Sequence, residues 1–212
     1  MTIPTEKEML MALEKRHGAE LQKKFTAASV AICGLGGLGS NIAIMLARAG
    51  IGRLHLIDFD TVDLSNLNRQ QYAVSQIGMP KTDALKETLS WIAPYCKIET
   101  DCVKITEENL PELLKNESII CEAFDAAENK AMLVNGVLSH FPEQYLIAAS
   151  GMAGISSANS IRTRRITKHF YLCGDEVSDI AENTALVLSR VMICAAHQAH
   201  TVLRILAGAD EV

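Results

Sequence analysis

Three glycines, Gly34, Gly36 and Gly39, form a G-x-G-x-x-G pattern between an apolar run and a segment rich in small residues. Glycine lets a ligand approach the backbone closely, and the free N–H groups at the start of a helix attract an anion. Asp58 ends the next apolar run, where a carboxylate can accept hydrogen bonds from ribose hydroxyls. The pattern predicts a nucleotide site. The alternative is a tight turn that only packs a helix against a strand.

The polar tract that follows Asp58 indicates which nucleotide fits. This tract is longer than a dehydrogenase needs, and it contains Arg69, with Lys81 at the start of the next helix-like segment. An arginine can donate two parallel hydrogen bonds to phosphate oxygens, and a lysine supplies a compact charge. A triphosphate would use both cations, whereas a nicotinamide-dependent oxidoreductase would leave them unexplained; as isolated residues, both could also be ordinary surface charges. Gly37 opens the glycine loop further, which also favours a ligand other than NAD.

A second acidic position follows a later apolar run. Asp125 comes directly after Ile119-Ile-Cys-Glu-Ala-Phe124. A carboxylate at the carboxyl end of a parallel strand faces the ligand crevice, and magnesium takes one or two carboxylates together with phosphate oxygens and water. Asp125 is therefore a candidate Mg²⁺ ligand. It could also cap a helix that begins near residue 126, and the two roles are compatible.

The elements that position these residues alternate between strands and helices. Such alternation is typical of parallel βαβ units, so we expect an α/β fold: a Rossmann-like, mostly parallel sheet flanked by helices. From residue 151 the pattern changes, which predicts an antiparallel extension of the sheet in the C-terminal part. The strands are expected at 29–33, 53–58, 96–102, 118–124 and 145–150, and the helices at 5–24, 41–49, 81–93, 107–115, 126–139 and 184–207. We expect one domain over 1–212, with an N-terminal helical arm (1–27), a nucleotide-binding core (28–150) and a sheet extension with the last helix (151–212).

Composition excludes several other classes. The chain has 212 residues, of which 49% are hydrophobic and 21% charged, enough for a globular core. A formal charge of −5 offers no basic field for nucleic acid. The longest apolar tract is interrupted by charged and polar residues, so no membrane span is expected. The start resembles no secretory leader and no Cys-x-x-Cys pair occurs, which favours the cytoplasm.

Taken together, five motifs closely resemble the ThiF/MoeB/HesA superfamily, the ubiquitin-activating-like adenylyltransferases. The motifs are Gly34-Leu-Gly-Gly-Leu-Gly39, Asp58-Phe-Asp60, Ser65-Asn-Leu-Asn-Arg-Gln70, Gly78-Met-Pro-Lys81 and Asp125. Five tracts look most like the short ThiF proteins of thiamine biosynthesis: Arg16-His-Gly18, Asn66-Leu-Asn-Arg-Gln-Gln71, Cys121-Glu-Ala-Phe-Asp125, Ala149-Ser-Gly-Met-Ala-Gly154 and Phe170-Tyr-Leu-Cys-Gly-Asp175. The resemblance implies ATP-dependent adenylylation of the C-terminal Gly-Gly of a ThiS-like sulfur carrier by a homodimer. Other implied possibilities are a molybdopterin carrier, a tRNA-modifying relative, or an inactive scaffold homologue. The complete set of Asp58, Arg69, Lys81 and Asp125 argues against lost activity.

The resemblance also implies roles for individual residues. Arg69 and Lys81 would bind phosphates, Asp58 would hold the ribose and Asp125 would coordinate Mg²⁺. An arginine from the N-terminal region of the other subunit completes the site in many members, and Arg16 is the candidate here. The residues expected to line the ATP site are Gly34, Gly36, Gly37, Gly39, Asp58, Asp60, Ser65, Asn66, Asn68, Arg69, Lys81, Asp125 and Ala126.

Metal and sulfur chemistry elsewhere in the chain is less well supported. Longer members carry two Cys-x-x-Cys pairs that bind zinc, and this chain has neither, so zinc is not expected. Cys173 lies near where the first pair would fall, and it is either a sulfur-transfer nucleophile or an inert strand residue. His197 and His200 lack an evident third ligand, and such a pair more often packs or forms hydrogen bonds than binds metal.

Overall fold

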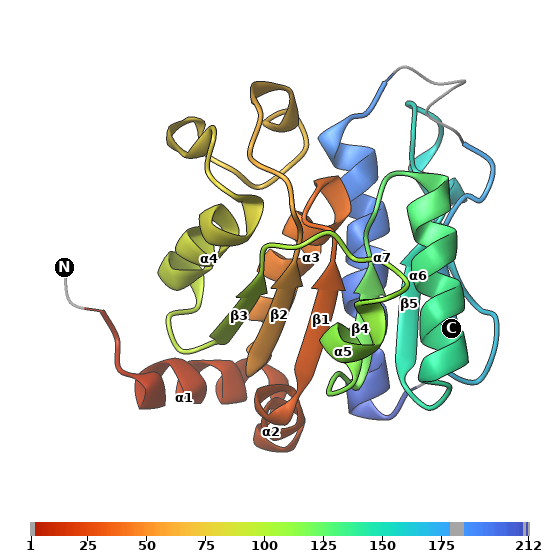
Figure 1. Cartoon of the computed structure of the whole chain (residues 1–212). Coiled ribbons are helices and arrows are strands. Elements are labelled where there is room, and N and C mark those ends of the chain that lie inside the picture. Colours follow the sequence, from red (N-terminus) through yellow and green to blue (C-terminus); the bar gives the residue numbers. More distant parts are fainter. Residues whose placement is uncertain (1–2, 179–184, 210, 212) are drawn as a thin grey trace.

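The computed structural model describes residues 3–178, 185–209 and 211, and in them seven strands form one sheet (Figure 1). The strand order is β3-β2-β1-β4-β5-β7-β6, and every neighbouring pair is parallel except β7 with β6. The strands are β1 (Ser29–Cys33), β2 (Arg53–Ile57), β3 (Lys97–Asp101), β4 (Ile119–Glu122), β5 (Tyr145–Ala149), β6 (Arg162–Arg165) and β7 (Phe170–Gly174). The predicted Rossmann-like sheet is confirmed, and its antiparallel extension is the edge strand β6.

Helices cover both faces of the sheet (Figure 1). Residues of α3, α4 and α7 join one buried cluster and residues of α5 and α6 join the other. The bounds are α3 (Gly37–Arg48), α4 (Lys81–Ile92), α5 (Leu110–Leu114), α6 (Ala127–His140) and α7 (Leu188–Ala207). None of the helices in the described part of the chain is long and apolar enough to cross a bilayer.

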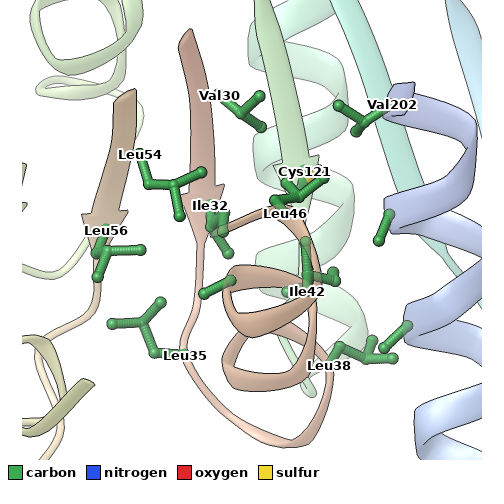
Figure 2. Packing of buried hydrophobic residues seen from close by; sticks show 14 of the residues in the cluster. Val30, Ile32, Leu35, Leu38, Ile42, Leu46, Leu54, Leu56, Cys121 and Val202 are labelled. Carbon is green, nitrogen blue, oxygen red and sulfur yellow. The ribbon is translucent and has the colours of Figure 1, made fainter. Parts of the chain in front are cut away.

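Strand β1 shows why the sheet needs helices on both sides. Successive side chains of a strand point to opposite faces. Val30 and Ile32 belong to the cluster under α3, whereas Ala31 and Cys33 belong to the cluster under α5 and α6. Figure 2 shows the first cluster, in which Ile32 lies among Leu54, Leu46 and Ile42. A strand buried on both faces reads as a continuous apolar run, which is how this one could be recognised.

The helix predicted over residues 5–24 is wrong in one respect: it is two helices, α1 (Glu6–His17) and α2 (Ala19–Ala27). They meet at Gly18, whose φ of +85° is accessible to glycine but strained for other residues. The Gly18 N–H donates to the carbonyl of Glu14 and closes α1. The helix expected at 41–49 also begins earlier, at Gly37, because the glycine loop passes directly into its first turn.

The loop 59–79 contains two short 3₁₀ turns, η1 (Leu64–Asn66) and η2 (Val74–Gln76). The last helix begins at Leu188, and the predicted start at 184 lies outside the described residues. The other predicted elements differ from the observed ones at their ends only, by three residues at most.

A charged network lies within the sheet around His55 of β2. Its Nδ1 lies 2.9 Å from Oε1 of Glu117 and its Nε2 lies 2.8 Å from Oδ2 of Asp101. Burial alone would lower the pKa of His55, but the hydrogen bonds and negative charges of Glu117 and Asp101 together outweigh it, so the pKa is raised. Arg53 pairs with Glu117 as well and holds that carboxylate from the other side. The network therefore favours a protonated imidazole that bridges two carboxylates.

We predict that this network makes stability depend on pH above neutrality. A raised folded-state pKa adds stability that is complete below the unfolded-state pKa of about 6.5 and is lost as pH rises through the folded-state value. His55→Gln should therefore lower the melting temperature most near pH 6 and progressively less toward pH 9. Thermal unfolding of both proteins across that range measures the difference. A difference that stays constant with pH would show that His55 is not charged in the folded protein.

Candidate functional site

A cavity opens at the carboxyl ends of the central strands. In the sheet order, β1 to β3 run outward in one direction and β4 and β5 in the other, so the order reverses between β1 and β4. Ligands of open α/β sheets bind at this switch point. The cavity is lined by Gly34, Gly36 and Gly37 after β1, by Asp58 to Asp60 after β2 and by Ala123 to Asp125 after β4. It measures about 180 Å³, less than most ligand pockets enclose, so a bound nucleotide would extend beyond it at the open edge.

The glycines of the loop serve different purposes. Gly34 has a φ of +93°, and a Cβ there would lie 2.9 Å from the carbonyl oxygen of Ala123. Gly39 does not line the cavity; a Cβ there would overlap the carbonyl oxygen of Gly34. A Cβ on Gly36 would meet nothing nearer than 3.8 Å. The last glycine of the pattern therefore allows the helix to pack against the loop, and the middle one leaves the cavity open.

Helix α3 points its N-terminus at the cavity. Its N-cap is Gly36, which has no side chain to accept a hydrogen bond from the first turn. The first N–H groups of a helix have no partners within it and carry part of the positive end of its dipole. These donors are therefore available to an anion in the cavity.

Asp58 joins the loops that follow β1 and β2. Its Oδ2 accepts from the Leu35 N–H at 2.6 Å and its Oδ1 accepts from the Asp60 N–H at 2.8 Å. Burial raises the pKa of this carboxyl, partly offset by the amide hydrogen bonds and by Lys81. Each oxygen has a second lone pair, so the carboxylate can still accept from a ligand. Asp58 thus fixes the glycine loop in addition to the predicted ribose contact.

The two predicted cations both line the cavity but lie in different surroundings. Lys81 is buried, and its Nζ lies 2.8 Å from Oδ2 of Asp60. Arg69 donates to the Ser65 carbonyl at 3.1 Å and to Oδ1 of Asn68 at 2.9 Å. Among the described residues, no carboxylate pairs with Arg69. Lys81 is therefore paired with Asp60 but keeps further Nζ–H donors for a ligand, while Arg69 has no carboxylate partner among these residues.

Asp125 lies at the cavity with an exposed side chain. Helix α6 takes Ala126 as its N-cap, so Asp125 stands one residue ahead of the capping position. No hydrogen bond of the Asp125 carboxylate is found within the described part of the chain. The arrangement favours the ligand-binding interpretation over capping.

Gln70 and Lys130, which the sequence did not single out, complete the lining of the cavity, and the buried Glu122 holds Lys130 in place. Gln70 is 7% exposed, lines the cavity, and its Oε1 has no hydrogen-bond partner. Glu122 is fully buried at the end of β4 and pairs at 3.0 Å with Nζ of Lys130 from α6, which also lines the cavity. A glutamate inside an apolar strand was the available signal for that pair. An unsatisfied buried carbonyl is unfavourable, so Gln70 fits a ligand that donates a hydrogen bond.

Several predicted site residues lie elsewhere. Ser65, Asn66, Asn68 and Ala126 flank the cavity residues in sequence but do not line the cavity. Arg16 lies on α1, a helix at the edge of the sheet where the strands begin (Figure 1), and it does not line the cavity of its own chain. Cys173 is fully buried in β7, where burial raises the pKa of its thiol to about 11, which favours the inert interpretation over a nucleophile. His197 contacts the Thr163 hydroxyl at 2.8 Å.

The chain is similar to known proteins over much of its length. The model of the ThiF family matches residues 9–212. A molybdopterin-synthase adenylyltransferase from Haemophilus influenzae is 42% identical over 113 residues, which are 53% of this chain and 46% of that protein. Ubiquitin-like modifier-activating enzyme 5 of Oryza sativa subsp. japonica is 46% identical over 97 residues, which are 46% of this chain and 23% of that protein. The chain thus spans less than half the length of these relatives.

Solved structures share the fold at low identity. The tRNA N6-threonylcarbamoyladenosine dehydratase TcdA of E. coli, solved with AMP, superposes with a TM-score of 0.85 at 18% identity over 98% of both chains. MccB of E. coli, solved with ATP, gives 0.74 at 20% identity over 99% of this chain and 67% of that one.

Alanine substitutions at Gly39 and Gly36 should distinguish the glycine that helix packing requires from the one that leaves the cavity open. Gly39→Ala should lower the free energy of unfolding by about 3 kcal/mol or more, because the methyl group must displace the Gly34 carbonyl or the helix. Gly36→Ala should change it by less than about 1 kcal/mol, because the new atom points into open space. Chemical denaturation of both variants measures the contrast, and equal stabilities would contradict this account of the loop.

Proposed function

Because this chain belongs to the ThiF family, as its motifs predicted, we propose that it is an ATP-dependent adenylyltransferase that activates the C-terminal carboxylate of a small ubiquitin-like carrier protein. One observation supports this most strongly. Arg69, Lys81 and Asp125 line one cavity together with the glycine loop and the N-terminus of α3. The two cations and the helix N-terminus can bind and neutralise phosphates, and Asp125 can hold a magnesium ion beside them; a simple dinucleotide site does not require these side chains.

In the proposed reaction, a carboxylate oxygen of the carrier attacks the α-phosphorus of ATP. The bond from that phosphorus to the oxygen that bridges to the β-phosphorus breaks, which releases pyrophosphate and leaves the carrier as an acyl-adenylate. No protein nucleophile is needed, since positioning and charge neutralisation supply the acceleration. The donors of α3 and the guanidinium of Arg69 would hold the phosphates and reduce the repulsion between the two anionic reactants.

The cavity at the glycine loop also offers a carboxylate, Asp125, that could hold a magnesium ion. The described residues contain no group of three or more acidic, histidine or cysteine side chains placed to hold a metal ion. Mg²⁺ in nucleotide sites uses one or two carboxylates and takes its other ligands from phosphates and water. Asp125, exposed at the cavity, would hold it there, and the ion would supply further charge neutralisation.

The carrier we propose is ThiS-like, with a role in thiamine biosynthesis, and the support is the set of short motifs that resemble ThiF. A molybdopterin carrier is the second candidate, because the Haemophilus influenzae relative that matches half of the chain bears that name. We further propose that the protein acts as a homodimer in which Arg16 of one subunit reaches the cavity of the other. The support is that Arg16 is exposed and lies away from the cavity of its own chain.

Exchange of radiolabelled pyrophosphate into ATP tests the activity directly. Purified protein with Mg²⁺ should catalyse exchange only when a cognate carrier is present, and fastest with a ThiS-like carrier from a panel that includes a molybdopterin carrier. A carrier that lacks its terminal glycine is the control. Well-folded protein that gives no exchange with any carrier would refute the proposal, and exchange only with the molybdopterin carrier would reassign the partner.

Variants of the two cations test the site. Arg69→Ala and Lys81→Ala should each lower the exchange rate by ~10²–10³-fold, the usual loss for one well-placed donor. Lys86→Ala, on the exposed side of the same helix as Lys81, is the matched control and should keep the rate. Melting temperatures identify any loss that comes from unfolding. Full activity of Arg69→Ala would exclude the phosphate-binding role.

A further inference from the structure

A second cavity, of about 480 Å³, lies at the far edge of the sheet, between β6 and the C-terminal half of α7. It shares no lining residue with the cavity at the glycine loop. Its volume falls within the range of ~300–1,000 Å³ that is usual for small-molecule sites. Nothing in the proposed adenylation uses it.

The face of α7 that lines this cavity is polar where a sheet-facing helix is usually apolar. His197, His200, Thr201 and Arg204 line it and follow the spacing i, i+3, i+4 and i+7, which places them on one side of a helix. The residues of α7 that enter the hydrophobic core, such as Val191, Cys194 and Val202, occupy other positions. The polar stripe therefore lines the cavity beside the apolar Ile205, and its residues lie outside the hydrophobic core cluster.

Arginines outnumber acids among the described residues that line the cavity, and two histidines add positive charge when they are protonated. Arg162 comes from β6, and His197, His200 and Arg204 come from α7, with the Tyr171 phenol from β7. Among the lining residues that the structure describes, Glu211 is the one acid. Its backbone carbonyl accepts a hydrogen bond from the Arg204 guanidinium at 2.7 Å. Neither Arg162 nor His200 has a side-chain hydrogen bond to another described residue.

Hydroxyl groups complete the lining. Oγ1 of Thr163 lies 2.8 Å from Nδ1 of His197 and fixes that ring, which leaves Nε2 without a described partner. The Thr201 hydroxyl donates to the His197 carbonyl at 2.7 Å. Burial and the neighbouring His200 lower the pKa of His197, so a bound anion would reverse that shift by favouring the protonated ring.

From this arrangement we propose that the cavity between β6 and α7 is a second ligand site, which takes the phosphate group of a small phosphorylated molecule. Arg204 and Arg162 supply guanidinium donors, the two histidines supply donors when protonated, and the volume leaves room for the rest of the ligand. A cation is disfavoured by the surrounding charge, and no metal-binding group of three His, Cys, Asp or Glu occurs in the described part of the chain.

NMR of ¹⁵N-histidine-labelled protein, titrated with inorganic phosphate and then pyrophosphate, tests the proposal without any assay of adenylation. The ring signals of His197 and His200 should shift in a saturable way, and the apparent pKa of His197 should rise with bound phosphate. His140, exposed on α6 and outside the cavity, is the internal control. The shifts should persist in Arg69→Ala, which weakens phosphate binding at the other cavity.

The phosphate affinity of variants in the cavity between β6 and α7 is the second test. His200→Gln and Arg204→Gln should each weaken phosphate binding about tenfold, the factor expected for one charge-assisted hydrogen bond. Arg164→Gln is the matched control, because Arg164 lies on β6 but pairs with Glu176 and does not line the cavity. His200 has no described side-chain hydrogen bond, so its replacement should leave the fold intact.

Three results would overturn the proposal. The first is linear shifts of equal size at His140, which indicate an unspecific ionic effect. The second is an unchanged affinity in both His200→Gln and Arg204→Gln. The third is histidine shifts that follow protein concentration in place of phosphate, which would show that the cavity is an interface between copies of the chain.

Discussion

There is no room for a side chain where the first turn of α3 crosses the loop that leaves β1. A Cβ on Gly39 would overlap the Gly34 carbonyl, and one on Gly34 would lie 2.9 Å from the Ala123 carbonyl. This close approach brings the helix N-terminus and the ends of β1 and β4 together. Because the Asp58 carboxylate accepts a hydrogen bond from the Leu35 N–H, the end of β2 is held against the same loop. The geometry of the site therefore depends on backbone contacts, and the charged side chains are added to a frame that is already fixed.

The charges of the site are divided between fixed and available groups. Lys81 with Asp60, and Lys130 with Glu122, are neutralised pairs in which one partner is buried. Removing one partner of such a pair would leave a buried charge uncompensated, which is strongly unfavourable. Arg69, Asp125 and the N–H groups of α3 retain their binding capacity at the cavity. A site built in this way can receive a polyanion without first rearranging its interior, which is the condition for electrostatic preorganisation.

The strands and the position of the site could be predicted because their signals are local. Apolar runs such as 29–33 mark strands buried on both faces, and glycines, Asp58 and Asp125 follow strand ends that a parallel sheet brings together. The break at Gly18 was missed because a single glycine interrupts helical periodicity very little. Pairs such as Glu122 with Lys130 depend on tertiary packing that spacing does not reveal. Ser65 was expected at the cavity, but its hydroxyl bonds Asp63 and shapes the loop.

Helix α7 contributes residues to both cavities. Near its start, Val191 lines the cavity at the glycine loop, and a Cβ on Gly37 would lie 2.9 Å from its Cγ1. One residue before Val191, buried Arg190 pairs with Asp175 and donates to the carbonyls of Ala153, Ser156 and Ser157, so it fixes the chain that leads into β6. The polar stripe near the end of α7 then faces β6 itself. The edge strand β6 carries Arg162, Arg164 and Arg165, of which Arg164 pairs with Glu176. Because α7 contributes residues to both cavities along its 20 residues, this one helix fixes their relative position.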